Sequence, residues 1–321
     1  MQKLLVILGP TSSGKTDLAI KLAKKFNGEL IACDSRQVYK KLDIGTGKLP
    51  SGKMTVEKGK GFWLMGEVKI WLYDVADFKK QYTVYDYVKD ANKVIDDIAK
   101  RQKLPIIVGG TGLYLRALLE GLPNLAIPVD QKLRKELEKL SLQELQKKLQ
   151  RLSLKKWKDM NNSDKQNSRR LVRAIEIASA DFTSDGVPKG LLRGSSKILK
   201  IGLTAPKETL YKKINSRVEK WIEEGIIDEV KNLITDGISK ERIRNLGLEY
   251  KVIIDYLNGE FSLDLAIKKM QNKVRQYARR QITWFRKEKD VSWFDITVAG
   301  WVRRVETQVN SWYYARDDQA H

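Results

Sequence analysis

The chain lacks the cysteine pairs and the long apolar runs that mark secreted and membrane proteins. Its single cysteine, Cys33, has no partner within the 321 residues, so an internal disulfide is excluded. Cys33 ends the apolar run Leu30-Ile31-Ala32-Cys33, which favours a small buried core residue in a reducing compartment. No apolar run approaches the roughly 18 to 20 residues that a membrane span needs, and Met1-Gln2-Lys3 leads straight into an expected strand. We therefore expect a cytoplasmic protein with no signal peptide and no membrane association.

Negative charge is also scarce. The chain has 61 Lys and Arg against 40 Asp and Glu, a formal net charge of +21 and a pI near 9.7. An excess of this size favours binding to polyanions through counterion release, and nucleic acid is the first candidate. A lysine-rich solvated surface remains the alternative interpretation of the same composition.

A phosphate-binding loop follows directly on the first apolar run. The stretch Gly9-Pro10-Thr11-Ser12-Ser13-Gly14-Lys15-Thr16 lies between the expected strand Leu4–Leu8 and a helical pattern from Leu18 to Phe26. Glycines at both ends let the backbone N–H groups turn inward, Lys15 adds a point charge, and the hydroxyl of Thr16 can ligate Mg²⁺. The loop therefore predicts a site for a di- or triphosphate, and it leaves open whether that phosphate is transferred, hydrolysed or expelled.

Two further strand ends should reach the same crevice. Leu30–Cys33 predicts a buried strand that ends at Asp34, and ligands of open α/β sheets lie beyond the carboxyl ends of strands. Asp34 is thus the leading candidate for a working carboxylate, with a helix cap or a ligand of magnesium-bound water as alternatives. Leu104–Val108 is a third such strand and should bring Thr111 to the crevice. The β-α alternation implies a mostly parallel sheet.

Other segments are assigned from spacing and composition. Leu42 to Lys60 is rich in glycine and lysine and is expected to be a loop, and Phe62 to Val75 is expected to hold two short strands. A helix face starts at Val84. Lys197–Leu203 is expected to return the chain to the sheet.

From residue 124 helical patterns replace strands. We expect a P-loop core over 1–123, a helical insertion over 124–181, core completion with a basic helical region over 182–295, and a C-terminal tail over 296–321 that contains a helix from Trp301 to Tyr314. Within these segments, Ser141 to Glu144 is a capping-box start, Asn161 to Asn167 a polar break, and Asp181 to Gly194 a loop.

The basic residues of these helices allow two interpretations. Arg169 and Arg170 fit either a salt-bridged surface or a phosphate grip. The pattern around Arg217 favours a helix-surface ion pair over a phosphate ligand. The last long helix carries Arg275 and Arg279 with interleaved aromatics, which suits either an RNA backbone or a solvated helix with aromatics in the core.

Six stretches in this order resemble the tRNA dimethylallyltransferase family, whose members prenylate adenosine 37 beside the anticodon. They are GPTSSGKT at 9–16, DSRQVYKKLDIGTGK at 34–48, VGGTGLYLRALLEGL at 108–122, QNSRRLVRAIEIA at 166–178, RVEKWIEEGIIDEV at 217–230 and VRQYARRQITWFR at 274–286. They extend over most of residues 1–295. The chain departs from the family's usual pattern at Asn161–Asp164, at Lys69–Val75 and near Leu246–Glu249.

The resemblance implies a P-loop NTPase-like α/β fold and a reaction. Asp34 would be the general base, with Thr111 aligning amine and diphosphate and Arg217 neutralising the leaving group. The diphosphate of dimethylallyl diphosphate would lie on Gly9, Pro10, Thr11, Ser12, Ser13, Gly14, Lys15 and Thr16, with Mg²⁺ on Thr16. The tRNA would contact Asp34, Ser35, Arg36, Gln37, Thr111, Arg134, Gln166, Asn167, Ser168, Arg169, Arg170, Arg275 and Arg279. A monomer acting on one tRNA is the expected state.

Two other function classes fit part of the sequence. A small-molecule P-loop kinase would explain the first 35 residues, but not the basic excess or the arginine-aromatic helix near the C-terminus. A non-catalytic RNA-binding protein with a vestigial P-loop would explain the charge, but not the presence of Lys15, Thr16, Asp34 and Thr111 together.

Overall fold

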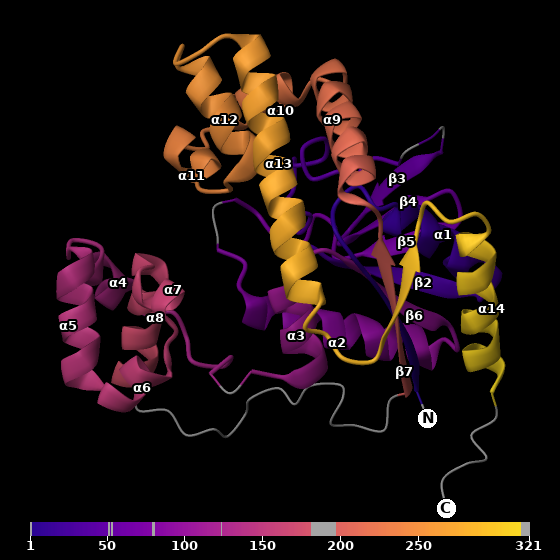
Figure 1. Cartoon of the computed structure of the whole chain (residues 1–321), viewed down its shortest axis with the longest axis horizontal. Coiled ribbons are helices and arrows are strands. Elements are labelled where there is room, and N and C mark those ends of the chain that lie inside the picture. Colours follow the sequence, from indigo (N-terminus) through magenta and orange to yellow (C-terminus); the bar gives the residue numbers. More distant parts are fainter. Residues whose placement is uncertain are drawn as a thin grey trace, which may run out of the picture. The chain divides into compact units, whose positions relative to one another are not determined.

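A single twisted sheet organises the larger part of the chain (Figure 1). The computed structural model describes residues 2–50, 52, 54–78, 81–122, 124–180 and 197–315. These residues form an eight-stranded sheet in the order β3-β4-β5-β2-β6-β1-β7-β8. All pairings are parallel except β3 with β4 and β4 with β5. The expected mostly parallel α/β sheet with flanking helices is confirmed.

The strands match the apolar runs of the sequence with two exceptions. Their bounds are β1 Lys3–Leu8, β2 Gly28–Cys33, β3 Val56–Gly59, β4 Phe62–Met65, β5 Val68–Trp71, β6 Leu104–Gly109, β7 Lys197–Thr204 and β8 Val291–Asp295. The expectation of a continuous loop over Leu42–Lys60 is wrong at its end, because β3 pairs there with β4 as an edge hairpin. The short strand β8, which pairs with β7, was not expected.

Helices of the sheet-containing unit follow the expected alternation. They are α1 Lys15–Lys25, α2 Val84–Lys100, α3 Gly112–Glu120, α9 Lys207–Glu223, α10 Ile226–Thr235, α11 Lys240–Arg244, α12 Leu248–Leu257, α13 Leu263–Phe285 and α14 Trp301–Tyr314. Helix α2 begins at a capping box in which Thr83 and Asp86 satisfy each other's backbone N–H groups. The helix expected from Trp301 to Tyr314 is confirmed.

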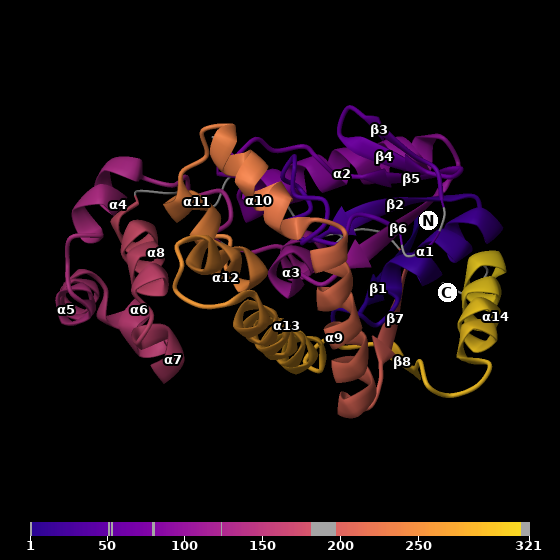
Figure 2. The same ribbon diagram turned by 90° about the horizontal axis from the view of Figure 1, so that it is seen from above.

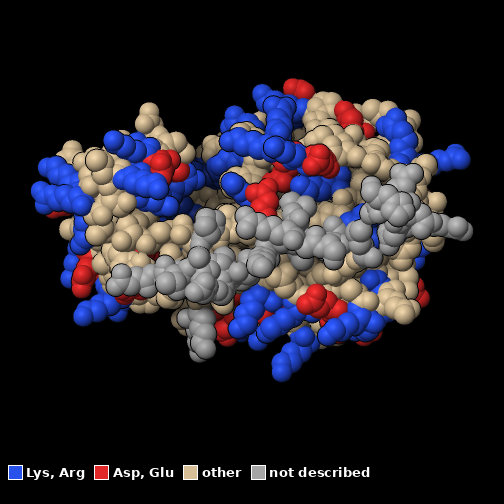
Figure 3. Space-filling model, turned by 90° about the horizontal axis from the view of Figure 1, so that it is seen from below, with Lys and Arg blue, Asp and Glu red and all other residues tan. Residues whose placement is uncertain are grey.

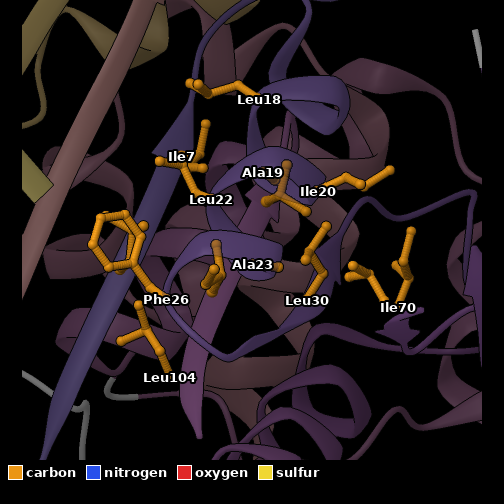
Figure 4. Close-up of a cluster of buried hydrophobic side chains, with 14 of the residues drawn as sticks. Ile7, Leu18, Ala19, Ile20, Leu22, Ala23, Phe26, Leu30, Ile70 and Leu104 are labelled. Atoms are coloured by element: carbon orange, nitrogen blue, oxygen red, sulfur yellow. The ribbon is translucent and has the colours of Figure 1, made fainter. Parts of the chain in front are cut away.

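The main core lies between the sheet and helix α1. Leu18, Leu22 and Phe26 project from one face of α1 onto strand residues such as Leu30 and Leu104 (Figure 4). Their i, i+4 spacing places them on one stripe, and burying such side chains stabilises the fold by about 1.5 to 3 kcal/mol each. This packing fixes α1, and with it the loop that precedes α1.

Cys33 is buried, as expected.

Helix α14 completes this core from the far end of the chain. Val305 and Val309 are fully buried in the same cluster, and Glu306 forms ion pairs with Lys21 and Lys25 of α1. Figure 2 shows α14 beside α1 at one side of the sheet. The C-terminal segment therefore belongs to the folded unit that carries the P-loop.

A second core forms among the helices after β7. Residues from α9, α10, α12 and α13 bury a cluster that includes Val218, Val230, Ile253 and Val274. Helix α13 packs along both α9 and α12. This helical layer borders the carboxyl ends of the strands.

Residues 121–189 form a separate compact unit, and the sheet-containing unit comprises residues 1–120 and 190–321. The helices of the smaller unit are α4 Gln131–Leu137, α5 Leu142–Leu152, α6 Leu154–Asp159, α7 Asn162–Lys165 and α8 Ser168–Ser179. Leu145, Leu149 and Ile175 are among the buried residues of that unit. The capping box of Ser141 and Glu144 is confirmed. The expected polar break is wrong in part, because Asn161 caps the short helix α7. The loop expected over Asp181–Gly194 lies outside the described residues.

Candidate active site

The P-loop joins β1 to α1 through backbone conformations that only small residues tolerate. Gly9 has a φ of +143°, and a Cβ there would lie 2.5 Å from the carbonyl oxygen of Leu203. Gly14 has a φ of +80° at the start of α1. The hydroxyl oxygens of Ser12 and Ser13 are buried and have no hydrogen-bond partner in the described structure. Buried donors without partners at a helix N-terminus are what an anion would satisfy.

A cavity of about 80 Å³ opens beside this loop. Seven of the residues expected at the site line it, namely Thr11, Lys15, Thr16, Asp34, Arg36, Gln37 and Arg217. They come from the P-loop, from the end of β2 and from α9, which are far apart in the sequence. The phosphate-binding lysine and the candidate carboxylate thus share one enclosed space.

Lys15 is held in place by the loop that it serves. Its ammonium donates to the carbonyl oxygen of Pro10 at 2.6 Å. Burial and the neighbouring Arg217 lower the pKa of Lys15 to about 7, and Asp34 opposes the shift. Two cations side by side are costly in a protein without ligand, and an anion between them would relieve that repulsion.

Thr111 is bonded to Ser35, the residue after Asp34, where β2 and β6 end. The backbone N–H of Arg36 donates to Asp34 Oδ1 at 2.9 Å, which leaves Oδ2 of the carboxylate for the cavity. The backbone N–H of Ser35 donates to Thr111 Oγ1 at 3.0 Å. The two strand ends are therefore joined directly, as expected for the carboxyl edge of a parallel sheet.

The guanidinium of Arg217 faces the cavity, so the expectation of a helix-surface ion pair for this residue is wrong. Arg217 Nη1 donates to Thr11 Oγ1 at 3.2 Å, and the guanidinium lies over the ring of Trp221 at 5.1 Å. Burial lowers the pKa of Arg217 from its ordinary value. Helix α9 packs its apolar stripe, which includes Ile214 and Val218, into the second core. Because Arg217 lies next to Val218 on the helix, this packing places Arg217 at the cavity rather than in solvent.

Two residues of α13 that the sequence analysis did not assign to this site line the cavity. Gln281 accepts from the backbone N–H of Thr11 at 2.8 Å and donates to the carbonyl oxygen of Gly110 at 2.9 Å. Tyr277 lines the cavity and carries Arg36 over its ring. Tyr277 and Gln281 lie on the buried side of α13, whereas the sequence analysis considered the arginines on its other side as RNA contacts. A polar glutamine at a position with core spacing was the available signal.

The hydroxyl of Thr16 lines the cavity and is the protein oxygen that would bind a magnesium ion. The described residues contain no cluster of three or more His, Cys, Asp and Glu side chains that could hold a metal by themselves. Mg²⁺ commonly keeps several waters and binds through one or two protein oxygens plus phosphate oxygens. The oxygen donors in the cavity fit this mode of binding. They do not fit a site in which the protein alone supplies all the magnesium ligands.

Comparison with known proteins decides the family. The family model described as IPP transferase matches residues 37–288, and the one described as isopentenyl transferase matches residues 2–68. The chain belongs to the IPP transferase family. Among curated relatives, the tRNA dimethylallyltransferase of Acetivibrio thermocellus is 38% identical and that of Halothermothrix orenii 36%; the matches cover 92% of this chain and 92% and 88% of the relatives.

Solved structures agree with this membership of the IPP transferase family. The tRNA isopentenylpyrophosphate transferase of Bacillus halodurans is 34% identical, with a TM-score of 0.68 and coverage of 97% of both chains. A eukaryotic dimethylallyltransferase that acts on tRNA is similar in fold, with a TM-score of 0.77 at 24% identity, over 100% of this chain and 82% of the other.

None of the described helices is both long and apolar enough to cross a bilayer.

The residues expected to contact RNA are distributed over both units. In the helical unit, Arg134 makes a bidentate ion pair with the buried carboxylate of Glu176, and Arg170 pairs with Asp164. Gln166, Asn167, Ser168 and Arg169 lie in the same unit, where Asn167 caps α8. On α13, Arg275 donates to Asn215 Oδ1 at 2.7 Å, and Arg279 is exposed. Figure 3 shows lysine and arginine side chains spread over the face that is drawn, with acidic side chains among them.

Proposed function

We propose that this member of the IPP transferase family transfers a dimethylallyl group from dimethylallyl diphosphate to N6 of adenosine 37 in the tRNA anticodon loop, with release of diphosphate. The observation that carries the proposal is that Asp34 shares one small cavity with Lys15, Thr16 and Arg217. A diphosphate leaving group and a proton acceptor are thus available within the same site. The proposal places one monomer on one tRNA in the cytoplasm.

At the donor end, the chain's cations and hydroxyls bind the diphosphate. Lys15 and Arg217 line the same cavity, and Arg217 is anchored on Thr11 of the P-loop. Negative charge grows on the leaving oxygen as the allylic C–O bond breaks, so donors fixed beforehand at that point lower the barrier. Mg²⁺, held by Thr16 and the diphosphate oxygens, would neutralise further charge on the leaving group when bound.

At the acceptor end, the amine needs help because its lone pair is delocalised into the adenine ring. The new bond forms between N6 and the allylic carbon, the C–O bond to diphosphate breaks with its electron pair on oxygen, and the N6 proton passes to Asp34. Thr111, which is joined to Ser35 beside Asp34, would align the amine with the diphosphate. The adenosine must leave the loop stack to bring N6 into an enclosed cavity.

The test incubates the full chain with unmodified tRNA, dimethylallyl diphosphate and Mg²⁺, followed by mass analysis of the nucleosides. We expect an adenosine that carries an added five-carbon unit, with one diphosphate released per modified nucleoside. ATP turnover on a small acceptor without a prenylated product would identify a kinase. Tight tRNA binding with no product under any condition would identify a non-catalytic RNA-binding protein.

A further inference from the structure

The carboxylate of Glu249 is fully buried and has no role in the reaction described above. It lies in the first turn of α12 with 0% of its side chain exposed. Oε1 forms an ion pair with Nη1 of Arg36, whereas Oε2 has no hydrogen-bond partner in the described structure. A buried carboxylate with an unsatisfied oxygen is destabilising, since desolvation of the charge is only partly offset. Such a cost is typical of a functional residue.

The turn that presents Glu249 is strained. Gly247 has a φ of +74° and Leu248 a φ of +46°, so two consecutive residues have positive φ. A leucine rarely adopts this conformation, because its Cβ crowds the backbone. The result is that Leu248 lines the cavity while Glu249 lies behind Arg36. This segment is also one where the sequence departs from the family's usual pattern.

Arg36 is held on three sides. Its guanidinium lies 5.8 Å from the ring centre of Tyr277, its own backbone N–H is fixed on Asp34, and Glu249 takes Nη1. Burial disfavours its charge, but Glu249 and Asp34 raise the pKa of the guanidinium above its ordinary value. A guanidinium has five N–H donors in a flat fork, so donors remain for the cavity that Arg36 lines.

The competing partner of Arg36 would be the diphosphate. Arg36, Lys15 and Arg217 line the same cavity, and a multiply charged anion there attracts all three. Only a fixed negative charge on the other side can keep Arg36 away from the donor. Glu249 is the carboxylate in that position, since its Oε1 forms the ion pair with Nη1 of Arg36.

We propose that Glu249 is a positioning residue that holds Arg36 over the ring of Tyr277 and away from the diphosphate, so that Arg36 donates to oxygen and nitrogen acceptors on the RNA nucleotide that enters the cavity. The proposal rests on the RNA substrate proposed above. It assigns α12, through Leu248 and Glu249, to the acceptor side of the site. Glu249 itself touches neither substrate.

The experiment is a double-mutant cycle of Glu249→Gln and Arg36→Ala in the full chain, with Glu260→Gln as an exposed control. An anticodon stem-loop and dimethylallyl diphosphate are titrated separately, and kcat and KM are measured for tRNA. We expect Glu249→Gln to weaken binding of the stem-loop about tenfold, with diphosphate binding unchanged or tighter and kcat at saturating tRNA within about threefold. In the Arg36→Ala background the second change should cost nothing more.

The proposal would be overturned if Glu249→Gln left stem-loop binding unchanged. It would also be overturned if the losses in stem-loop binding caused by Glu249→Gln and Arg36→Ala added up in the double variant. A parallel loss of diphosphate binding and thermal stability, which indicates a purely structural carboxylate, would overturn it as well. If Glu249→Gln does not fold, Glu249→Asp, which keeps the charge but is one methylene shorter, runs the same cycle with the same criteria. A wild-type chain that binds the stem-loop but forms no prenylated product would refute the proposed function, and the binding cycle would still decide on Glu249.

Discussion

The guanidinium of Arg217 lies directly against the Cα of Gly47. A Cβ added at Gly47 would stand 1.7 Å from Arg217 Nη2, far inside van der Waals contact. The loop that carries Gly47 cannot easily retreat, because Glu229 accepts from the backbone N–H groups of Asp43 and Ile44 at 2.7 Å each. Lys48, fully buried, ties the other end of the loop to Asp74 and to the carbonyl oxygen of Tyr39. Arg217 is therefore placed by a glycine as much as by its own helix.

Gly47→Ala should displace Arg217 from the cavity. We expect kcat to fall roughly 10- to 100-fold, since loss of one fixed donor to a developing charge costs about that much or more. The left-handed φ of +65° adds about 1 kcal/mol of strain to an alanine. Steady-state kinetics with tRNA check this. Gly52→Ala is the matched control, because nothing lies within 4 Å of its Cβ. A Gly47→Ala enzyme with wild-type kcat would show that Arg217 is not required at its observed position.

Gln281→Met should loosen the P-loop from the loop that ends β6. The side chain is 5% exposed, and its removal leaves the N–H of Thr11 and the carbonyl of Gly110 without partners. Each buried group left unpaired costs about 1 to 3 kcal/mol, so we expect a lower melting temperature together with a roughly 10- to 100-fold loss in kcat/KM. Gln271→Met, on the same helix, removes an exposed hydrogen bond of 3.4 Å to Glu219 and should retain both properties. Equal behaviour of the two variants would refute this role.

The arrangement of the cavity was only partly predictable from sequence, and the reason is physical. The P-loop, Asp34 and Thr111 were predicted because each follows a strand at a fixed short distance, and parallel strands bring their carboxyl ends together. The orientation of Arg217 was not predictable, because it depends on Gly47 and on the core under α9. Gln281 likewise acquires its role from two backbone groups more than 170 residues away.

Other gaps have the same origin. Strand β8 is five residues long and is stabilised by pairing with β7. Its sequence has no alternation of apolar and polar residues that would have predicted a strand. Arg134 pairs with Glu176, which lies 42 residues further along the chain and was not predicted as its partner. The expected contact of Arg134 with RNA stays a prediction. Local patterns identify which residues are charged or apolar, whereas the partner of a charge is decided by tertiary packing.

Stability in acid should depend on Glu29, at the opposite end of β2 from Asp34. Burial by itself would raise the pKa of this carboxyl, but hydrogen bonds from Arg101, Lys103 and Trp71 lower it to about 2. A folded-state pKa below the ordinary value of 4.5 adds stability above that pH, and the contribution is lost as pH falls from about 4.5 to about 2. Because Arg101 and Lys103 are partly exposed, solvent screening reduces this contribution to on the order of 1 to 2 kcal/mol at neutral pH.

Glu29→Gln should therefore lower the free energy of unfolding at pH 7 and flatten its dependence on pH between about 4.5 and about 2. Urea denaturation at a series of pH values measures both. The prenyl-transfer rate at pH 7 and 25 °C should stay near wild type, since the ion pair is remote from the cavity. Glu57→Gln, at an exposed position, should leave the curve unchanged. A Glu29→Gln variant that keeps the full acid sensitivity of the wild type would contradict the assignment.

The most direct test of Asp34 as the proton acceptor is the single-turnover rate of Asp34→Asn with saturating tRNA and dimethylallyl diphosphate. Asparagine keeps the shape and can still accept from the N–H of Arg36 but cannot take the N6 proton, so the rate of prenyl transfer should fall roughly 10²- to 10⁴-fold while both substrates still bind. A rate within about threefold of the wild type, with both substrates bound, would show that the proton leaves by another route.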